Sequence, residues 1–204
     1  MNGLQLTGES TIFANTFFMK RLFSLGIVLS FCLVAAAQSA LPPVDKSPMD
    51  MSYYPANYPV LKIQDKITEP LVARVIYSRP RIDGRIIFGG LVEYGKLWRL
   101  GANEATEIEF FQKVSIGDKK IPKGRYTLYA IVNETSWTFI LNKETDTWGS
   151  FKYYPEKDVV RIEVPVEKLD EQVEYFVMAF EKVNSNINLV VAWENVKVAL
   201  PIIL

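Results

Sequence analysis

The chain has 204 residues, 49% of them hydrophobic and 13% aromatic, which is enough for one domain with a sizeable core. Its 23 basic residues balance 23 acidic ones, so we expect no binding to nucleic acid or to an anionic membrane surface. There is no histidine, which removes the commonest general base near neutral pH and the commonest metal ligand. We predict neither a metal site nor a cofactor.

The N-terminus has the pattern of an export signal. A Lys-Arg pair at residues 20–21 precedes an apolar run over residues 22–37, which ends in three alanines of the kind a signal peptidase reads. We predict that residues 1–37 are a signal peptide, with Met19 as its natural start, and that the protein is periplasmic or extracellular. The run is shorter than the roughly 20 residues of a spanning helix, and a bulky residue precedes Cys32. These features favour cleavage over a retained anchor or a lipidated Cys32.

Residues 38–59 contain five prolines interleaved with methionines and tyrosines. Proline at this density is expected to prevent a helix or a central strand. The aromatic residues indicate that the segment lies along the domain. We predict an extended arm here, and a disordered linker is the alternative interpretation.

Residues 60–204 show a hydrophobic period of two, which is typical of strands with one buried face. Turn residues separate the alternating runs, and no amphipathic helix exceeds two turns. A segment with four glycines, residues 81–97, predicts a structured loop. We predict an all-β fold, an antiparallel β-sandwich of about eight to nine strands with one glycine-rich structured loop. Trp137 alternates with core positions and is expected inside, and residues 195–203 are expected to add a final edge strand.

Several motifs, each specific in order and spacing, resemble a family of exported bacterial proteins known as domain of unknown function 2911. They are Tyr77-Ser78-Arg79-Pro80, Gly84-Arg85-x-Ile87-Phe88-Gly89, Trp98-Arg99-Leu100-Gly101-Ala102-Asn103-Glu104-Ala105-Thr106, Pro122-x-Gly124-x-Tyr126-x-Leu128, Trp148-Gly149 and Asp158-Val159-x-Arg161. The likeness covers about residues 47–191. It implies an exported β-rich domain and supplies no activity, substrate or catalytic residue. The family often has proline where this chain has Glu93, which affects only the rigidity of that loop.

The segment over residues 96–110 gathers more polar groups among anchoring residues than any other part of the chain. Its arginine and its carboxylates allow two interpretations. In the first interpretation, a buried ion network fixes the glycine-rich loop, because arginine offers a planar fork to carboxylates. This network consists of Arg79, Arg85, Arg99 and Glu104. Alternatively, the same arginines bind an anionic ligand such as a carboxylate or a phosphate.

Two further interpretations concern the carboxylates and the aromatic residues. Glu104, Glu107 and Glu109 are compatible with a glycoside-type hydrolase, which needs two carboxylates, although alternating glutamates are also ordinary on the solvent face of a strand. Trp148, Tyr153 and Tyr154 lie in a polar loop and are candidates for stacking on sugar rings.

The leading hypothesis is a non-enzymatic exported β-sandwich that binds a small molecule, a glycan or an envelope protein through the loops at residues 79–104 and 148–154. A carboxylate-dependent hydrolase is the alternative. No catalytic residue is predicted. The predicted ligand-binding residues are Arg79, Arg85, Trp98, Arg99, Asn103, Glu104, Trp148 and Tyr153.

Overall fold

A computed structural model describes residues 41–204, so the predicted signal peptide lies outside the described residues. The chain divides into two units between Val44 and Asp45, and the first contributes only residues 41–44 to the description. Everything below concerns the second unit, residues 45–204. None of its helices is long and apolar enough to cross a membrane.

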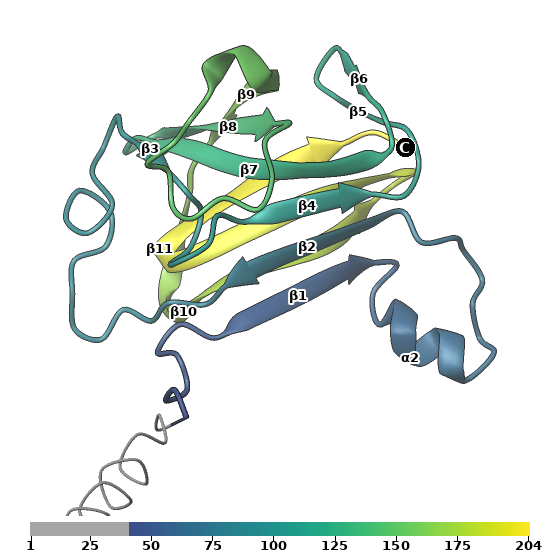
Figure 1. Cartoon of the computed structure of the whole chain (residues 1–204), viewed down its shortest axis with the longest axis horizontal. Helices are drawn as coiled ribbons and strands as arrows, with labels where there is room; N and C mark the ends of the chain where they lie inside the picture. The colour runs from purple at the N-terminus through teal and green to yellow at the C-terminus, as the bar shows by residue number, and fades with distance from the viewer. Residues whose placement is uncertain (1–40) are drawn as a thin grey trace, which may run out of the picture. The chain divides into compact units, whose positions relative to one another are not determined.

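The larger layer is a seven-stranded antiparallel sheet (Figure 1). Its strands lie in the order β1-β2-β4-β7-β8-β9, and the short β3 pairs with β7. They are β1 (Met49–Tyr54), β2 (Ala73–Ser78), β3 (Leu97–Trp98), β4 (Glu107–Phe110), β7 (Gly124–Val132), β8 (Ser136–Asn142) and β9 (Asp158–Pro165). β9 ends at Pro165 and lies at one edge of the sheet, where the missing N–H of a proline is tolerated.

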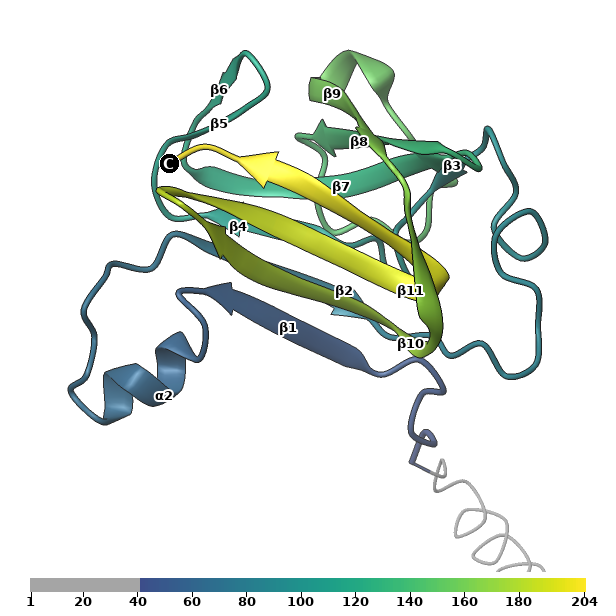
Figure 2. The ribbon, with the colours of Figure 1, turned by 180° about the vertical axis from the view of Figure 1, so that it is seen from behind.

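A long hairpin of β10 (Glu167–Val183) and β11 (Asn186–Ile202) forms the second layer and lies across the sheet (Figure 2). A small hairpin of β5 (Val114–Ile116) and β6 (Lys119–Ile121) completes the strands of the described residues. The prediction of a separate strand over residues 195–203 is wrong. β11 continues through an irregularity at Glu194, where a positive φ of 55° shifts the register without ending the strand.

The core lies between the sheet and the hairpin. At one end it contains five aromatic rings, from Phe88, Trp98, Trp137, Phe176 and Trp193. Trp137 is only 1% exposed, which confirms its predicted inward position. Each buried aromatic side chain contributes roughly 1.5–3 kcal/mol through the water it excludes, with a further ~0.5–1.5 kcal/mol for a well-oriented ring pair. This end of the sandwich is therefore rigid. The fold is the predicted all-β sandwich.

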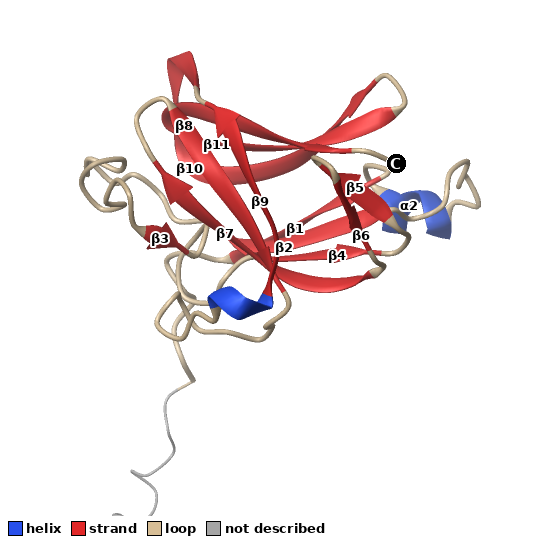
Figure 3. Ribbon diagram, turned by 90° about the horizontal axis from the view of Figure 1, so that it is seen from above, coloured by secondary structure: helices blue, strands red, loops and turns tan. Residues whose placement is uncertain are grey.

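The segment predicted as an extended arm, residues 38–59, contains β1 and the start of helix α2 (Tyr58–Ile63). β1 is the edge strand beside β2, which places it along the domain. The expectation that proline prevents a helix here is wrong, because Pro59 lies in the first turn, where its missing N–H leaves no helical hydrogen bond unmade. No residue of α2 is buried, and the helix stands apart from the strands (Figure 3).

The outer face of the sheet is also partly covered. Ala105, Tyr129 and Ile140 form a small second core beneath the loop over residues 143–157, and Tyr153 packs against it. The short helix η1 (Pro155–Lys157) ends this loop and leads into β9. The loop therefore adds a third element to the sandwich on the side opposite the hairpin.

Candidate functional site

The loop between β3 and β4 is held in a strained conformation by its own side chains. Leu100 is fully buried and has a positive φ of 54°, which is unusual for a non-glycine residue. The Trp98 indole N–H donates to the Gly101 carbonyl at 3.2 Å. The Thr106 hydroxyl donates to the Leu100 carbonyl at 2.5 Å. The Trp98 and Thr106 side chains thus hold the backbone of this loop through contacts within the protein.

Ser78, at the end of β2, connects this loop to the sheet. Its hydroxyl accepts from the Ala102 N–H at 2.6 Å and donates to the Ala102 carbonyl at 2.5 Å. Gly101, which directly precedes Ala102, has a φ of 147°. A Cβ at Gly101 would lie 2.8 Å from the Ser78 Oγ. Two of the sequence motifs therefore meet in space, and this contact requires both the serine and the glycine.

One cleft of about 180 Å³ opens beside this loop, and we call it the arginine cleft. Its lining includes Arg85, Leu91, Val92, Trp98, Arg99 and Trp193. Three of the eight predicted ligand-binding residues, Arg85, Trp98 and Arg99, therefore come together. Trp98 and Trp193 lie nearly parallel, with ring centroids 6.1 Å apart and 16° between the planes. The walls are apolar and rigid, and the charge comes from arginine.

The charge of Arg99 is not compensated within the described residues. Its Nε is buried and has no hydrogen-bond partner there. No salt bridge within residues 41–204 includes Arg99, and no acidic residue lines the cleft. Burial lowers the pKa of the Arg99 guanidinium, because desolvation disfavours its charged form. A half-buried cation in an apolar cleft attracts an anion.

The predicted ion network of Arg79, Arg85, Arg99 and Glu104 is wrong. Arg79 pairs with Asp50 at 3.0 Å and also donates to the Phe176 carbonyl, so it connects the edge strand β1 to β10 of the hairpin. Arg85 donates to two carbonyls within its own loop, at 3.0 and 2.6 Å. Arg79 and Arg85 therefore bind different partners, and neither forms an ion pair with Glu104.

A second cleft of about 280 Å³ lies on the outer face of the sheet, and we call it the carboxylate cleft. Its lining includes Met49, Ile76, Glu104, Glu107, Asp146 and Thr147. Backbone hydrogen bonds join the two loops that form it, from Ala105 N–H to the Thr147 carbonyl and from Gly149 N–H to the Asn103 carbonyl. The two loops of the leading hypothesis are thus paired, with a cleft next to them.

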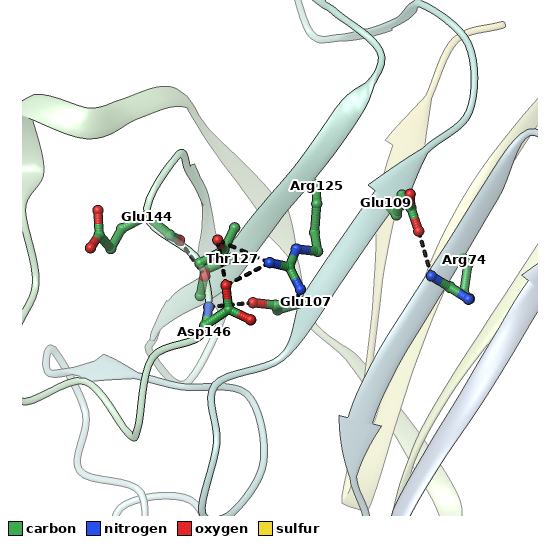
Figure 4. Close-up of polar contacts among 8 residues, drawn as sticks. Arg74, Glu107, Glu109, Arg125, Thr127, Glu144 and Asp146 are labelled. Atoms are coloured by element: carbon green, nitrogen blue, oxygen red, sulfur yellow. Dashed lines mark hydrogen bonds and ion pairs between the residues drawn. The ribbon is translucent and has the colours of Figure 1, made fainter.

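The charges of the carboxylate cleft are largely compensated (Figure 4). Arg125 lies 3.3 Å from Glu107 and 2.5 Å from Asp146, and the Asp146 N–H donates to Glu107 at 2.6 Å. Glu109, on the same strand face as Glu107, pairs with Arg74 at 2.5 Å. These are contacts of ionised carboxylates with structural partners. Glu107 and Asp146 therefore have partners, whereas Glu104 is exposed and has no ion pair among residues 41–204.

The remaining predicted residues have separate positions. Trp148 is 62% exposed and lies opposite Glu104 in an isolated antiparallel bridge. Asn103 supplies the turn, with a positive φ of 60°. Tyr153 is part of a polar network, because its hydroxyl donates to Asp158 at 2.5 Å and accepts from Arg161 at 2.6 Å. Tyr153 thus anchors the loop that covers the sheet.

Comparison with known proteins bears on the family. The family model described as "Protein of unknown function (DUF2911)" matches residues 59–202. The chain belongs to the DUF2911 family. No curated protein sequence and no solved structure matches this DUF2911 chain. The family resemblance drawn from the motifs is confirmed, and the search for a function rests on the two clefts of this DUF2911 protein.

Sequence reasoning missed several residues of the two clefts. Trp193 lies on β11, nearly a hundred positions from Trp98 in the sequence. The hydrophobic alternation of the segment around Trp193 indicated only a core strand. Ser47 and Pro80 also line the arginine cleft, and only Pro80 belonged to a motif. Asp146 was one of many polar residues in its loop. Its pairing with Arg125 depends on the fold of that loop and leaves no mark in the sequence.

Proposed function

We propose that this DUF2911 protein is an exported, non-enzymatic binding protein and that the arginine cleft binds a small anionic molecule. The observation that carries the proposal is Arg99, which is half-buried, lines a cleft together with two tryptophans and has no counter-charge in the described residues. Export is supported by the charged pair and apolar run at the N-terminus.

A binding role explains Arg99 better than a structural role. A buried arginine that stabilises a fold has its charge paired with a carboxylate, as Arg74 has with Glu109 and Arg79 with Asp50, although the Arg74 Nε also has no hydrogen-bond partner among residues 41–204. Arg99 has no such counter-charge in the described residues, and its buried Nε has no hydrogen-bond partner there. An anion entering the cleft would supply the missing counter-charge.

Thermal unfolding of the purified protein in a panel of acetate, benzoate, phosphate, sulfate and neutral sugars tests the proposal. A ligand at a hundred times its Kd adds about 2.7 kcal/mol to the free energy of unfolding, which gives a clear rise in Tm. We expect the rise with at least one anion and its loss in Arg99→Gln. Arg81→Gln, an exposed arginine outside the cleft, is the matched control and should keep the rise.

Two results would contradict the proposal. One is the absence of any anion-dependent rise in Tm. The other is an equal rise in the wild type and in Arg99→Gln, which would place the binding elsewhere. A rise with sugars alone would move the ligand site to the exposed Trp148.

A carboxylate-dependent hydrolase is the second candidate, because Glu104 and Glu107 line one cleft. Its weakness is that Glu107 is only 14% exposed and already bound to Arg125 and the Asp146 N–H, so it is a poor proton donor. Turnover of a panel of aryl glycosides by the wild type, abolished in Glu104→Gln, would establish this activity. Absence of turnover in the wild type would remove it.

A further inference from the structure

We infer that the arginine cleft selects a small monocarboxylate with an apolar body of about the size of one ring. The inference rests on the proposed function and names the class of its ligand. Three properties of the cleft lead to it: the number of unpaired charges, the number of free donors, and the size and polarity of the walls.

Neither arginine of the cleft has a counter-charge among the described residues, but only Arg99 is partly buried. Arg99 lacks a partner among the described residues, whereas Arg85 is exposed and already donates to the carbonyls of Ile82 and Arg81. A solvated guanidinium at a rim adds little, because water and salt screen it. A single negative charge therefore matches the cleft, and a dianion would carry an excess charge into an apolar environment.

The donors that surround Arg99 are mostly used. The Trp98 indole N–H donates to the Gly101 carbonyl, and the Trp193 indole N–H donates to the Glu174 carbonyl at 3.2 Å. The Ala102 N–H donates to Ser78. The two oxygens of a carboxylate match the fork of one guanidinium. A phosphate or sulfate would keep further oxygens unpaired in the cleft, at a cost for each.

The walls are suited to an apolar body. Leu91, Val92 and Pro80 line the cleft with the two tryptophans. The volume of about 180 Å³ exceeds the ~150 Å³ of an apolar cavity that holds benzene, so a ring or a branched chain fits beside Arg99. A carboxylate without such a body, for example acetate, would leave these walls without contacts.

Isothermal titration of the purified protein with four probes tests the inference. The probes are benzoate, the neutral isostere benzamide, acetate and inorganic phosphate. We expect benzoate to bind at least tenfold more tightly than each of the others. In Arg99→Lys, which keeps the charge and removes the fork, we expect at least a tenfold loss of benzoate affinity. Arg81→Lys, outside the cleft, should bind benzoate as the wild type does.

The outcomes separate this inference from the proposed function. Phosphate binding as tightly as benzoate, with loss in Arg99→Gln, would overturn the inference and keep the anion-binding function. Benzamide binding as tightly as benzoate, or wild-type benzoate affinity in Arg99→Lys, would also overturn the inference. No binding of any of the three anions, benzoate, acetate or phosphate, would remove both.

Discussion

The arginine cleft and the carboxylate cleft both include residues of the loop between β3 and β4. They differ in whether their partly buried charged side chains have ion-pair partners. Arg99 contributes to the first cleft and Glu104 and Glu107 to the second. On the carboxylate side, Arg125 holds Glu107 and Asp146. On the arginine side, Arg99 is half-buried and has no counter-charge in residues 41–204.

This difference separates the charges that the fold explains from a charge that it does not explain. A charge with its partner is explained by the fold, because the pair joins two elements and needs nothing else. A charge without a partner is a cost to the fold. Selection keeps such a cost where a ligand depends on it. The comparison therefore gives the arginine cleft priority, and the predictions below test it in order of expected effect.

The largest effect is expected from Gly101→Ala, which removes the loop geometry that both clefts share. The new Cβ would lie 2.8 Å from the Ser78 Oγ, at a φ of 147° that side chains rarely adopt. Backbone strain and the displaced Ser78 hydrogen bonds together should lower the free energy of unfolding by about 3 kcal/mol. Urea denaturation gives this value directly.

Gly84→Ala is the matched control, because Gly84 also has a positive φ, 70°, but nothing lies within 4 Å of its would-be Cβ. It should lose only the conformational cost, about 1 kcal/mol. Equal losses in the two variants would show that the close approach of Ser78 does not constrain the loop.

Ser78→Ala tests the link between β2 and the same loop. The substitution leaves the Ala102 N–H and carbonyl without their partner, and the loss should be about 2 kcal/mol. Ser150→Ala is the control, because its hydroxyl makes only one long contact, 3.4 Å to the Leu97 carbonyl, and should change stability by less than ~0.5 kcal/mol. A loss in Ser78→Ala as small as in the control would contradict the proposed link.

The sequence predicted the fold far better than the site, for a physical reason. The period-two pattern of a strand records which side chains face the core, so the sandwich and the inward Trp137 followed from alternation alone. The irregularity at Glu194 left the pattern intact on both sides, so β11 was read as two strands. The six-residue helix α2, with proline as its second residue, was likewise too short to show a period.

The clefts depend on contacts that have no period. Three of the eight predicted residues, Arg85, Trp98 and Arg99, line one cleft, whereas the predicted ion network also included Glu104, which lines the other cleft. Opposite charges close in sequence suggest a pair, yet the strained turn at Leu100 and Gly101 sends successive side chains to different clefts. Only the folded loop shows which charge has a partner.

Replacing one arginine from each side sharpens the comparison. Arg125→Met removes the partner of Glu107 and Asp146 and should lower the free energy of unfolding by about 1 kcal/mol. Arg99→Met removes an uncompensated charge and keeps the side-chain volume, so it should be neutral or raise the free energy by up to about 1 kcal/mol. Denaturation in ligand-free buffer measures both. A loss in Arg99→Met as large as in Arg125→Met would make Arg99 a structural residue.

The smallest effect concerns Tyr153, which anchors the loop that forms one wall of the carboxylate cleft. Burial, and then the hydrogen bond to Asp158, raise the pKa of Tyr153 to about 12. Because this pKa lies above the ordinary 10.0, the folded state keeps the phenol proton longer than the unfolded state. The stabilisation is fully present below pH 10 and is lost as the pH rises from about 10 to 12.

We therefore expect the free energy of unfolding of the wild type to fall more steeply than that of Tyr153→Phe between pH 10 and 12. The extra loss should be less than about 1 kcal/mol, because the phenol is only partly buried and solvent screens it. The other tyrosines are common to both proteins, so their titration cancels in the difference. Parallel curves would mean that Asp158 and Arg161 hold the loop without Tyr153. The wall of the carboxylate cleft would then depend on the Arg125 contacts alone.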